Sequence, residues 1–455
     1  MKLRIDPGGA LRGEVLTGSE VGIPGDKSLS HRAALFAALA EGESVIQNLL
    51  VSGVTEAMLR SLSTVGVVWE LNGSRLTIQG NGITGFVPQK SILNCGNSAT
   101  TMRLLAGAMA LAGISVVLDG SGGLRRRPMG RIVDPLRAMG VPITASDANR
   151  APLVLNSRAR EIPLKSRVHR LAVASAQVKS CIILASLAAD GETKIIEPGP
   201  SRDHTERMLS SMGVEISGSQ HHDPFSNGKL LYETRVAPSV PLRLSPLQIT
   251  LPGDISSAAF LIVAALITPD SDVVLRGVGL NPTRTGLLDA LMQMGADIQI
   301  AGQRLSAGEP VGDLEVKYSS LQAANISGEL VVRMIDEFPV FAVAAAYADG
   351  VTIVSEADEL RTKESDRISV ICRNLFGLGV DIQEKPDGFH IRGGNGVTGG
   401  AAVAFGDHRL AMSMAVAGLA SRHPVVIQGA EIINESFPQF IEVLQVLGAQ
   451  LSLEE

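Results

Sequence analysis

Pro24-Gly25-Asp26-Lys27-Ser28-Leu29-Ser30-His31-Arg32 decides how this chain folds, because a run of small and aliphatic residues, 33–40, follows it directly. The run is apolar on nearly every face, which is typical of a buried helix. A buried helix offers chemistry only at its polar first turn. There, unpaired N–H groups and a partial positive charge suit a phosphate or a carboxylate. The stretch therefore predicts a buried helix whose start binds an anion.

The same arrangement, a short polar motif in front of an apolar run, recurs along the chain, and several of the motifs carry charged residues. The further motifs are Asn97-Ser98-Ala99-Thr100, Ser175-Ala176-Gln177, Asp254-Ile255-Ser256, Asp336-Glu337 and Asp407-His408-Arg409. Together with the first, they predict six buried helices. The pattern indicates a scaffold that directs the starts of such helices at an anionic substrate.

A second recurring element is an amphipathic helix that ends in a hydrophobic residue and a glycine before a strand. Glycine is favoured just past a helix C-terminus, where a left-handed backbone closes the last turn. The glycines concerned are Gly66, Gly140, Gly213, Gly295, Gly379 and Gly448. Each repeated unit therefore contains one buried helix, one amphipathic helix and several short strands.

Almost half the chain length after the opening motif, Pro252-Gly253-Asp254-Ile255-Ser256 echoes residues 24–28. A chain of 455 residues is also too long for one ordinary core. We therefore expect an α/β (α+β) fold of two similar domains with three units each, crossing near Pro238-Ser239-Val240-Pro241. The predicted domain I is 23–240, domain II is 1–22 plus 241–455, and the site lies in the cleft between them.

Composition excludes several classes of function. A net charge of −6 and 3% aromatic residues argue against a general nucleic-acid binder. Cys95, Cys181 and Cys372 are widely spaced, so neither a disulfide framework nor a zinc site is indicated. The apolar runs are too short to span a bilayer, and residues 1–7 lack a signal-peptide core. We expect a cytoplasmic protein that binds small molecules, not nucleic acid or membrane, and has no metal site. That it is a monomer without a cofactor is a separate expectation, which composition does not decide.

Three charged motifs are candidates for ligand binding. The stretch 25–32 combines Lys27, Ser28 and Arg32 near one helix start, and its alternative explanation is an Asp or Ser cap with solvated charges. Arginines crowd into 124–131, where Arg127 is our choice for an anion contact and Pro128 is expected to open the next helix. The alternative is a solvated basic loop.

The third motif, Thr362-Lys363-Glu364-Ser365-Asp366-Arg367, alternates in sign. We expect Lys363, Glu364 and Arg367 to lie on adjoining faces of one helical turn. A surface ion-pair network is an equally good explanation for this motif and for Asp407-His408-Arg409. The sequence leaves that choice open.

At these motifs the chain resembles the 5-enolpyruvylshikimate-3-phosphate (EPSP) synthase family. The matching stretches run through nearly the whole chain: 24–32, 95–103, 126–131, 174–180, 201–209, 334–339, 361–367 and 407–412. The resemblance implies the enolpyruvyl transferase fold, an inside-out barrel in which each domain has three βαβαββ units. It also implies transfer of the enolpyruvyl group of phosphoenolpyruvate to the 5-hydroxyl of shikimate 3-phosphate, with release of phosphate and without a cofactor.

The resemblance implies particular site residues as well. Shikimate 3-phosphate is expected on Lys27, Ser28, Arg32, Ser175, Ala176, Arg202, Asp336 and Lys363. Phosphoenolpyruvate is expected on Lys27, Asn97, Arg127, Gln177, Arg367 and Arg409. Addition of the hydroxyl needs a base near its oxygen and an acid near C3 of phosphoenolpyruvate. By resemblance Asp336 is the base and Glu364 the acid, with Lys27 a rival for either transfer.

Two departures from the family pattern matter. Glu435 stands where many members have a phosphate-facing lysine, and Ala99 stands where glyphosate-sensitive members have glycine. Ala99 together with Arg202-Asp203-His204-Thr205-Glu206 resembles the class II branch, so weak inhibition by glyphosate is expected.

Three rival hypotheses remain at this point. The related transferase acting on UDP-N-acetylglucosamine typically has a reactive cysteine in the loop that matches 125–128, and this chain has none there. A non-catalytic anion-binding or RNA-end-processing protein on the related repeat is disfavoured by the paired carboxylates Asp336 and Glu364. A duplicated scaffold without activity leaves the cations at the helix starts unexplained.

Overall fold

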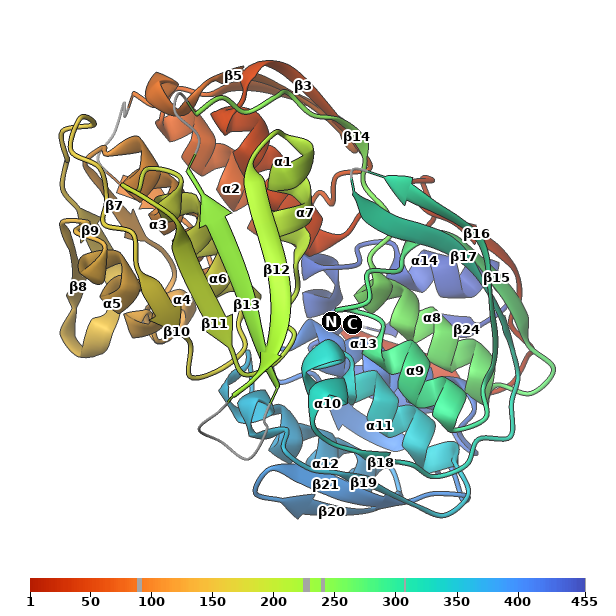
Figure 1. Ribbon diagram of the computed structural model, residues 1–455. Coiled ribbons are helices and arrows are strands. Elements are labelled where there is room, and N and C mark those ends of the chain that lie inside the picture. The colour runs from red at the N-terminus through yellow and green to blue at the C-terminus, as the bar shows by residue number, and fades with distance from the viewer. Residues whose placement is uncertain (88–91, 224–229, 239–241, 307, 455) are drawn as a thin grey trace. The chain divides into compact units, whose positions relative to one another are not determined.

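The computed structural model describes residues 1–87, 92–223, 230–238, 242–306 and 308–454 (Figure 1). The chain forms two compact units. Unit 1 contains Met1–Gly25, Pro252–Leu305 and Pro310–Glu455, and unit 2 contains Asp26–Leu251 and Ser306–Glu309. Of the crossing point expected at 238–241, residues 239–241 lie outside the described residues.

The division between the units follows residue 25 where 22 was expected, and residue 251 where 240 was expected. Gly25 forms a β-bridge with Gly253, and Asp254 N donates to Pro24 O at 2.9 Å, so the last residues before the opening helix stay with unit 1. At the other crossing, Leu247 and Leu251 are buried in the core of unit 2. The two copies of the repeated motif, at 24–25 and 253–254, thus contact each other through backbone hydrogen bonds.

Three buried helices form the centre of each unit, as predicted. In unit 2 they are α1 (Lys27–Leu39), α3 (Ala99–Ala112) and α6 (Ala176–Ser186). In unit 1 they are α8 (Ile255–Ile267), α11 (Phe338–Tyr347) and α13 (His408–Leu419). Every side chain of α8 is buried, which explains why its sequence is apolar on all faces. At Gly107 an added Cβ would clash with the carbonyl oxygen of Cys181, so α3 and α6 approach closely.

The amphipathic helices follow the buried ones along the chain. They are α2 (Gly53–Thr64), α5 (Gly130–Ala138) and α7 (His204–Ser211) in unit 2, and α9 (Gly286–Gln293), α12 (Arg367–Gly377) and α14 (Phe440–Val446) in unit 1. The glycine predicted beyond each of them has a φ between +87° and +108°. These left-handed residues confirm the predicted helix ends. Shorter helical segments are α4 (Gly122–Arg125), α10 (Glu329–Arg333), η1 (Ile83–Gly85), η2 (Asp147–Asn149), η3 (Asp358–Thr362) and η4 (Ala430–Glu435).

One expected helix start was wrong. Pro128 does not open a helix, because α5 begins at Gly130 with Met129 as its N-cap. Met129 N donates to Asn149 O at 2.9 Å, which holds the chain outside helical geometry up to that residue. The segment between α4 and α5 is therefore a loop that carries Arg126–Pro128.

The described strands form six four-stranded sheets, three in each unit. In unit 2 their orders are β14 (Gln248–Thr250), β3 (Glu41–Gln47), β5 (Arg75–Asn81), β4 (Val68–Asn72); β6 (Ile92–Asn94), β7 (Val116–Asp119), β9 (Arg150–Leu155), β8 (Ile143–Ser146); and β10 (Val168–Arg170), β11 (Thr193–Glu197), β13 (Leu230–Ala237), β12 (Glu215–His222). In each of these sheets the first pair is parallel and the following pairs are antiparallel. The repetition of one pattern is what a duplicated unit produces.

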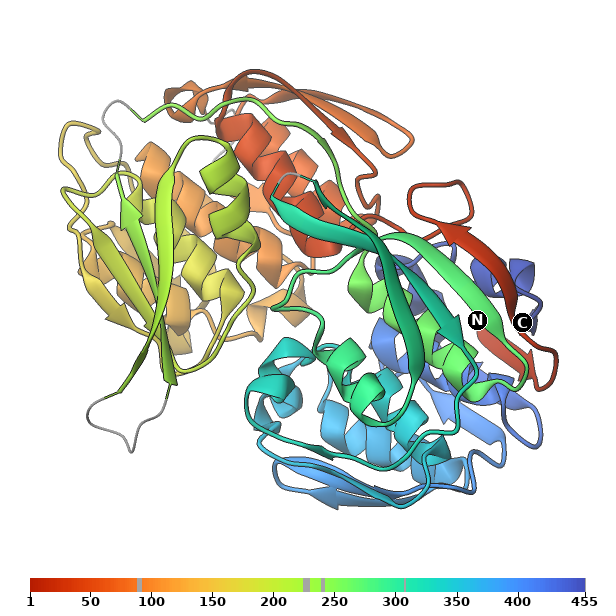
Figure 2. The same cartoon turned by 45° about the vertical axis from the view of Figure 1, so that its right-hand side comes forward.

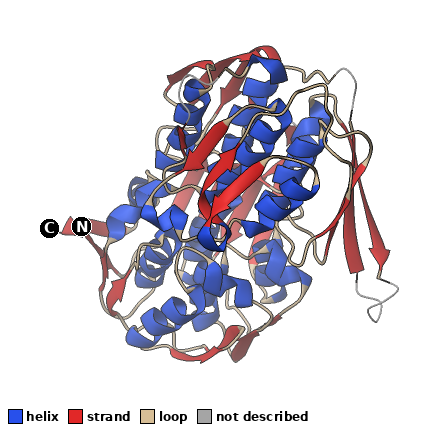
Figure 3. Cartoon of the chain, turned by 90° about the vertical axis from the view of Figure 1, so that its left-hand side faces the viewer, coloured by secondary structure: helices blue, strands red, loops and turns tan. Residues whose placement is uncertain are grey.

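In unit 1 the sheet orders are β16 (Asp297–Ser306), β17 (Glu309–Lys317), β15 (Asp272–Gly279), β2 (Arg12–Leu16); β18 (Asn325–Ile326), β19 (Val351–Val354), β21 (Gly388–Arg392), β20 (Asp381–Lys385); and β22 (Gly400–Val403), β23 (Val425–Gln428), β1 (Lys2–Asp6), β24 (Gln450–Glu454). Each sheet of unit 1 also has one parallel pair at an edge, which is β15–β2, β18–β19 and β22–β23 in turn. Strand β1 pairs with β23 and β24, so the two chain ends lie side by side, as Figure 2 shows. Figure 3 shows strands on the outer faces of the helices within each unit. The helix starts are thus placed by an apolar core.

Candidate active site

The opening motif leads into α1 of unit 2, as predicted, and its Asp26 caps the helix, as the alternative explanation expects. Asp26 accepts the backbone N–H of Leu29 at 2.8 Å, and Lys27 and Ser28 are half-buried in the first turn. Arg32 is buried, and its Nη1 donates to Ser28 O at 3.0 Å. Burial lowers the pKa of Arg32 to about 10, so its guanidinium is still charged at neutral pH. The helix start therefore carries a buried positive charge.

Hydroxyl groups from two other helices orient Arg32. Its Nε donates to Thr205 Oγ1 at 2.7 Å and its Nη2 to Ser180 Oγ at 2.8 Å. Thr205 lies on α7 directly after the segment that carries Arg202, which is half-buried. These contacts of Arg32 connect α1, α6 and α7. Residues predicted to bind shikimate 3-phosphate lie at the start of α1, at the start of α6 and just before α7.

A neutral histidine supports the same turn. His31 Nδ1 lies 2.7 Å from Lys27 O, and Nε2 lies 3.4 Å from Ser98 Oγ at the N-cap of α3. Burial lowers the pKa of His31 to about 4, so the ring is uncharged at neutral pH. His31 therefore orients the backbone of Lys27 and adds no charge.

The starts of α3 and α6 are connected through Gln177. Gln177 Nε2 donates to Thr100 Oγ1 at 2.9 Å, and Arg103 Nη1 donates to Gln177 Oε1 at 2.5 Å. Arg103 Nη2 also reaches Pro128 O at 3.2 Å, in the arginine-rich loop. Arg103 was not among the predicted site residues. A single arginine inside an otherwise apolar helix was the sequence signal for it.

The other two predicted residues of this region lie at the start of α3. Ala99 is its first residue and is 5% exposed, whereas Asn97 is exposed and its Oδ1 accepts Ser121 Oγ at 2.9 Å. A side chain larger than Ala at position 99 would therefore have to displace packed neighbours.

The arginines of the loop differ in their surroundings. Arg125 pairs with Asp119 through two hydrogen bonds of 2.9 and 2.5 Å and is largely exposed. Arg126 is exposed, and Arg127 is half-buried. Exposed ion pairs contribute little binding energy to a site. The more enclosed setting of Arg127 agrees with its choice as the anion contact, which stays a prediction.

In unit 1 the predicted residues meet around Arg367, which is 1% exposed. Its Nη1 lies 3.2 Å from Asp336 Oδ1 and its Nη2 2.8 Å from Glu364 Oε2. Its Nε donates to Asp407 Oδ2 at 2.9 Å. Although burial opposes its charge, the three carboxylates raise the pKa of Arg367. The two carboxylates expected to transfer protons thus contact one buried arginine.

The same cluster acts on Asp407, the N-cap of α13. Burial favours the neutral acid, but the charges of Arg367 and His408 outweigh it and lower the pKa of Asp407. Its other oxygen accepts the backbone N–H of Arg409 at 3.0 Å. Asp407 therefore stays ionised and holds both arginines in place.

The expectation that Lys363, Glu364 and Arg367 share one helical turn was wrong. Asp366 is the N-cap of α12 and accepts Ser369 N at 3.2 Å, so the helix begins only at Arg367. Lys363 and Glu364 lie in the connection between η3 and α12, and Lys363 Nζ pairs with Glu359 at 3.1 Å. Glu364 reaches Arg367 from this connection and not along a helix face.

Arg409 is buried and contacts the two acidic residues that directly precede α11. Its Nη1 donates to Asp336 O at 3.2 Å and lies 3.7 Å from Glu337 Oε1. Glu337 also accepts a hydrogen bond from Ser256 at the start of α8. Sequence reasoning named Asp336-Glu337 as a motif but gave a role only to Asp336. Glu337 connects Arg409 to α8.

Glu435, the departure from the family pattern, lies at the end of η4 and is close to the start of α13. Its Oε2 is 4.0 Å from His408 Nδ1. The position where many members have a lysine thus carries a carboxylate facing a histidine. The arginines that contact the carboxylates of this cluster are Arg367 and Arg409.

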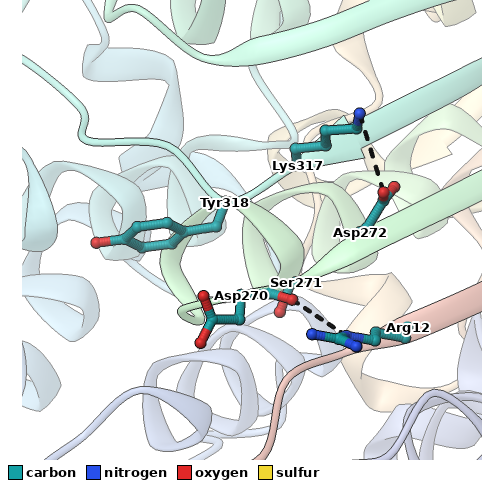
Figure 4. A pocket seen from close by; sticks show the side chains of 6 residues that line it. All are labelled: Arg12, Asp270, Ser271, Asp272, Lys317 and Tyr318. Atoms are coloured by element: carbon teal, nitrogen blue, oxygen red, sulfur yellow. Dashed lines mark hydrogen bonds and ion pairs between the residues drawn. The ribbon is translucent and has the colours of Figure 1, made fainter.

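A hollow elsewhere in unit 1 contains none of the predicted residues. Its volume is about 450 Å³, and it is lined by Arg12, Asp270, Ser271, Asp272, Lys317 and Tyr318 (Figure 4). Lys317 pairs with Asp272 at 3.9 Å, and Arg12 donates to the carbonyl of Asp270 at 3.3 Å. The lining is mostly polar and internally paired.

In the described part of the chain, no group of three or more His, Cys, Asp or Glu side chains is arranged to hold a metal ion. Among the same residues, no helix is long and apolar enough to cross a membrane. The three cysteines are buried and form no disulfide.

Six repeated units, with cations or carboxylates at the starts of several of their buried helices, define a protein of the enolpyruvyl transferase class. The profile of the EPSP synthase (3-phosphoshikimate 1-carboxyvinyltransferase) family matches residues 11–444. The 3-phosphoshikimate 1-carboxyvinyltransferase of Desulforudis audaxviator is 46% identical over 451 residues, which cover 98% of this chain and 99% of the relative. That of Desulfitobacterium hafniense is 43% identical, covering 97% of each chain.

A solved structure agrees with these relatives. The EPSP synthase of Acinetobacter baumannii superimposes with a TM-score of 0.87 at 38% identity and covers 100% of both chains. The chain therefore belongs to the EPSP synthase family. The predicted family and fold class are confirmed, and so is the predicted enzyme, which transfers the enolpyruvyl group of phosphoenolpyruvate to shikimate 3-phosphate.

Proposed function

We propose that the predicted residues of the two units act together as one active site for this reaction. The 5-hydroxyl oxygen of shikimate 3-phosphate attacks C2 of phosphoenolpyruvate while C3 gains a proton, which forms a tetrahedral intermediate. Loss of phosphate from C2 and of a proton from C3 then restores the double bond. Both substrates are anions, so the starts of the buried helices suit them.

The residues of unit 2 are proposed to hold shikimate 3-phosphate. Ser28 and Arg32 of α1, Ser175 and Ala176 at the start of α6, and Arg202 before α7 supply the cations, hydroxyl groups and N–H groups that a phosphate needs. What supports this is the set of contacts that orient Arg32: its three nitrogens donate to Ser28, Ser180 and Thr205. Because these contacts already hold Arg32 in place, little side-chain entropy is lost when it binds a ligand.

Phosphoenolpyruvate is proposed to bind Lys27, Asn97, Arg127 and Gln177 of unit 2 and Arg367 and Arg409 of unit 1. Arg103 is added here as the residue that orients Gln177. Guanidinium groups suit this ligand because their planar fork can contact a carboxylate or phosphate with two nitrogens. Lys363 and Asp336 are proposed to reach the acceptor substrate.

For the proton transfers, Asp336 is proposed as the base and Glu364 as the acid, with Lys27 the alternative for either. What supports these roles is the position of both carboxylates on one buried guanidinium: Asp336 Oδ1 lies 3.2 Å and Glu364 Oε2 lies 2.8 Å from Arg367. The base must be ionised and the acid protonated when the substrates are bound.

The observation that carries the proposal is the convergence of Asp336, Glu364 and Asp407 on the buried Arg367. Phosphate release by the purified protein, with phosphoenolpyruvate and either shikimate 3-phosphate or UDP-N-acetylglucosamine as acceptor, tests the substrate. Release with shikimate 3-phosphate only is expected. Release with the nucleotide sugar only would overturn the assignment of the acceptor site.

We also propose a class II, glyphosate-tolerant enzyme that acts in the cytoplasm as a monomer. Burial raises the pKa of Cys95, Cys181 and Cys372 to about 12, so these thiols are unreactive and suit a reducing compartment. Ala99 at the start of α3 supports the tolerance. The mass of the purified protein by light scattering tests the monomer.

A further inference from the structure

A buried ionic cluster lies behind the start of α6 in unit 2. Lys179 is 4% exposed and Glu197 is 1% exposed, and Lys179 Nζ lies 3.0 Å from Glu197 Oε2 and 2.8 Å from Glu206 Oε1. Although burial opposes its charge, the two carboxylates raise the pKa of Lys179, so it is a cation at neutral pH. Buried ion pairs seldom increase stability over apolar side chains of equal volume. The contacts of this cluster indicate a different use for it.

Glu197 holds two separate backbone segments. It ends β11, and its Oε1 accepts the N–H of Ser175, the N-cap of α6, at 2.9 Å. Its Oε2 accepts the hydroxyl of Ser201 at 2.8 Å, and Lys179 Nζ donates to Ser201 O at 3.3 Å. Ser201 is the neighbour of Arg202 in the chain. A single carboxylate therefore connects the two segments that carry Ser175, Ala176 and Arg202.

Glu206 shares the lysine but has different contacts. It lies on α7, and one of its oxygens pairs with Lys179. Its other oxygen, Oε2, is buried without a hydrogen-bond partner among the described residues. Both glutamates therefore compensate the charge of Lys179, whereas Glu197 also orders the segments at 175 and 201. Comparing substitutions of Glu197 and Glu206 can therefore distinguish the loss of these backbone contacts from the loss of a charge beside Lys179.

We propose that Glu197 is a positioning residue for shikimate 3-phosphate, which holds the start of α6 and the segment before α7 in the arrangement that receives the substrate. The inference rests on the proposed assignment of Ser175, Ala176 and Arg202 to that substrate. A hydrogen bond to a charged acceptor is stronger than a neutral one, so the carboxylate fixes the N–H of Ser175 more firmly than an amide could. Loss of this order makes binding of the acceptor weaker, because the segments must then be ordered at the moment of binding.

The test compares two substitutions of Glu197 in the full-length enzyme. Glu197→Gln keeps the size of the side chain and removes its charge, and Lys179 keeps Glu206 as its partner. Glu197→Asp keeps the charge but shortens the side chain, so the carboxylate no longer reaches Ser175 N. Both variants are expected to raise KM for shikimate 3-phosphate about 10-fold, near the value of one hydrogen bond to a charged group. KM for phosphoenolpyruvate is expected to stay within about 2-fold. Gln177 is the one residue proposed for that substrate at the start of α6, and Thr100 and Arg103 hold it independently of Glu197.

Glu206→Gln is the matched control, because it removes the other carboxylate on Lys179 and leaves the contacts of Ser175 and Ser201 intact. It is expected to change the thermal midpoint but not KM for shikimate 3-phosphate. Unchanged KM in both folded Glu197 variants would overturn the proposal. An equal rise for both substrates, an equal rise in Glu206→Gln, or loss of folding in both Glu197 variants would also overturn it, because Glu197 would then act only on stability.

Arg202→Ala, measured in parallel, separates this proposal from the site assignment. If Arg202→Ala raises KM for shikimate 3-phosphate and the Glu197 variants do not, the positioning role alone fails. If Arg202→Ala has no effect, the assignment of this segment to shikimate 3-phosphate fails first.

Discussion

The start of α1 in unit 2 and the start of α8 in unit 1 have the same motif and different environments. Asp26 caps α1 by accepting the N–H of Leu29 at 2.8 Å, and Asp254 caps α8 by accepting the N–H of Ser256 at 2.8 Å. Both helices are buried along most of their length. An aspartate side chain thus caps the first buried helix in both halves of the chain.

The side chains that follow the caps differ. Lys27 of α1 corresponds to Ile255 of α8, which is 2% exposed, and Arg32 corresponds to Phe260. Phe260 packs edge to face on Phe440 with ring centroids 6.0 Å apart. The positions that bear cations in unit 2 are therefore part of the apolar core in unit 1.

Side chains of the protein itself occupy the start of α8 and bond to its polar groups. Arg284, which is 2% exposed, donates to Ser256 Oγ at 2.8 Å and to Asp254 Oδ1 at 3.2 Å, and Ser256 in turn donates to Glu337. In unit 2 the equivalent Ser28 is half-buried, and Arg32 binds its carbonyl instead. One duplicated helix start is therefore the proposed position of a ligand, and the other anchors Glu337 beside Arg409. A cap alone does not decide between these uses.

The largest effect is expected from Lys27→Met, compared with Ile255→Met. If Lys27 contacts both substrates as proposed, removing its charge should lower kcat/KM for each about 10³-fold. Ile255→Met conserves volume in a buried position and should leave kcat/KM within about 2-fold. Steady-state phosphate release measures both variants. Equal losses would mean that the two helix starts are not used differently.

Arg284→Met tests whether the closed start of α8 is structural. Removing one partner of a buried ionic group typically costs about 3–5 kcal/mol, because the remaining carboxylate stays buried without its cation. The free energy of unfolding, from urea titration, should fall by about this amount, and KM for shikimate 3-phosphate should hardly change. A stable variant with weakened binding of that substrate would give α8 the role assigned to α1.

Glu364→Gln addresses the carboxylates of unit 1. If Glu364 supplies the proton to C3, the amide cannot replace it, and kcat should fall roughly 10²-fold. Both KM values should change less than kcat, because the amide can still accept a hydrogen bond from Arg367. Rapid-quench measurement of a single turnover separates this step from product release. Near-normal turnover would remove Glu364 from the mechanism and favour Lys27.

Arg367→Lys tests whether the arginine that pairs with three carboxylates in unit 1 also contacts phosphoenolpyruvate. Lysine cannot reproduce three nitrogens that face Asp336, Glu364 and Asp407, so the cluster loses at least one contact. KM for phosphoenolpyruvate is expected to rise about 10-fold, the value of roughly one charged hydrogen bond. An unchanged KM would place Arg367 outside the site and leave it a structural group.

The smallest effect is expected from Ala99→Gly at the start of α3. Removing one methyl group that is nearly buried should make room for a ligand slightly longer than phosphoenolpyruvate, and so increase inhibition by glyphosate several-fold. KM for phosphoenolpyruvate should change little. Inhibition constants against phosphoenolpyruvate measure the effect. Tight inhibition of the unchanged protein would contradict the expected tolerance.

The sequence predicted most of the architecture, because the patterns involved are short-range. Apolar runs behind capping motifs predicted α1, α3, α6, α8, α11 and α13, and the glycines beyond the amphipathic helices all adopt the left-handed backbone. The errors were local too. Pro128 and the segment 363–366 lie outside helices, because Asn149 and Asp366 determine where α5 and α12 begin.

What the sequence by itself determined is therefore the set of helix starts, their repetition and the family, all of which depend on neighbouring residues and ordered motifs. Only the tertiary structure decided which charges meet. Arg32 binds Ser180 and Thr205, Glu197 binds Ser175, and Arg367 gathers three carboxylates from separate segments. The physical reason is that such contacts join side chains far apart in the chain, and only packing of the core brings them within hydrogen-bond distance.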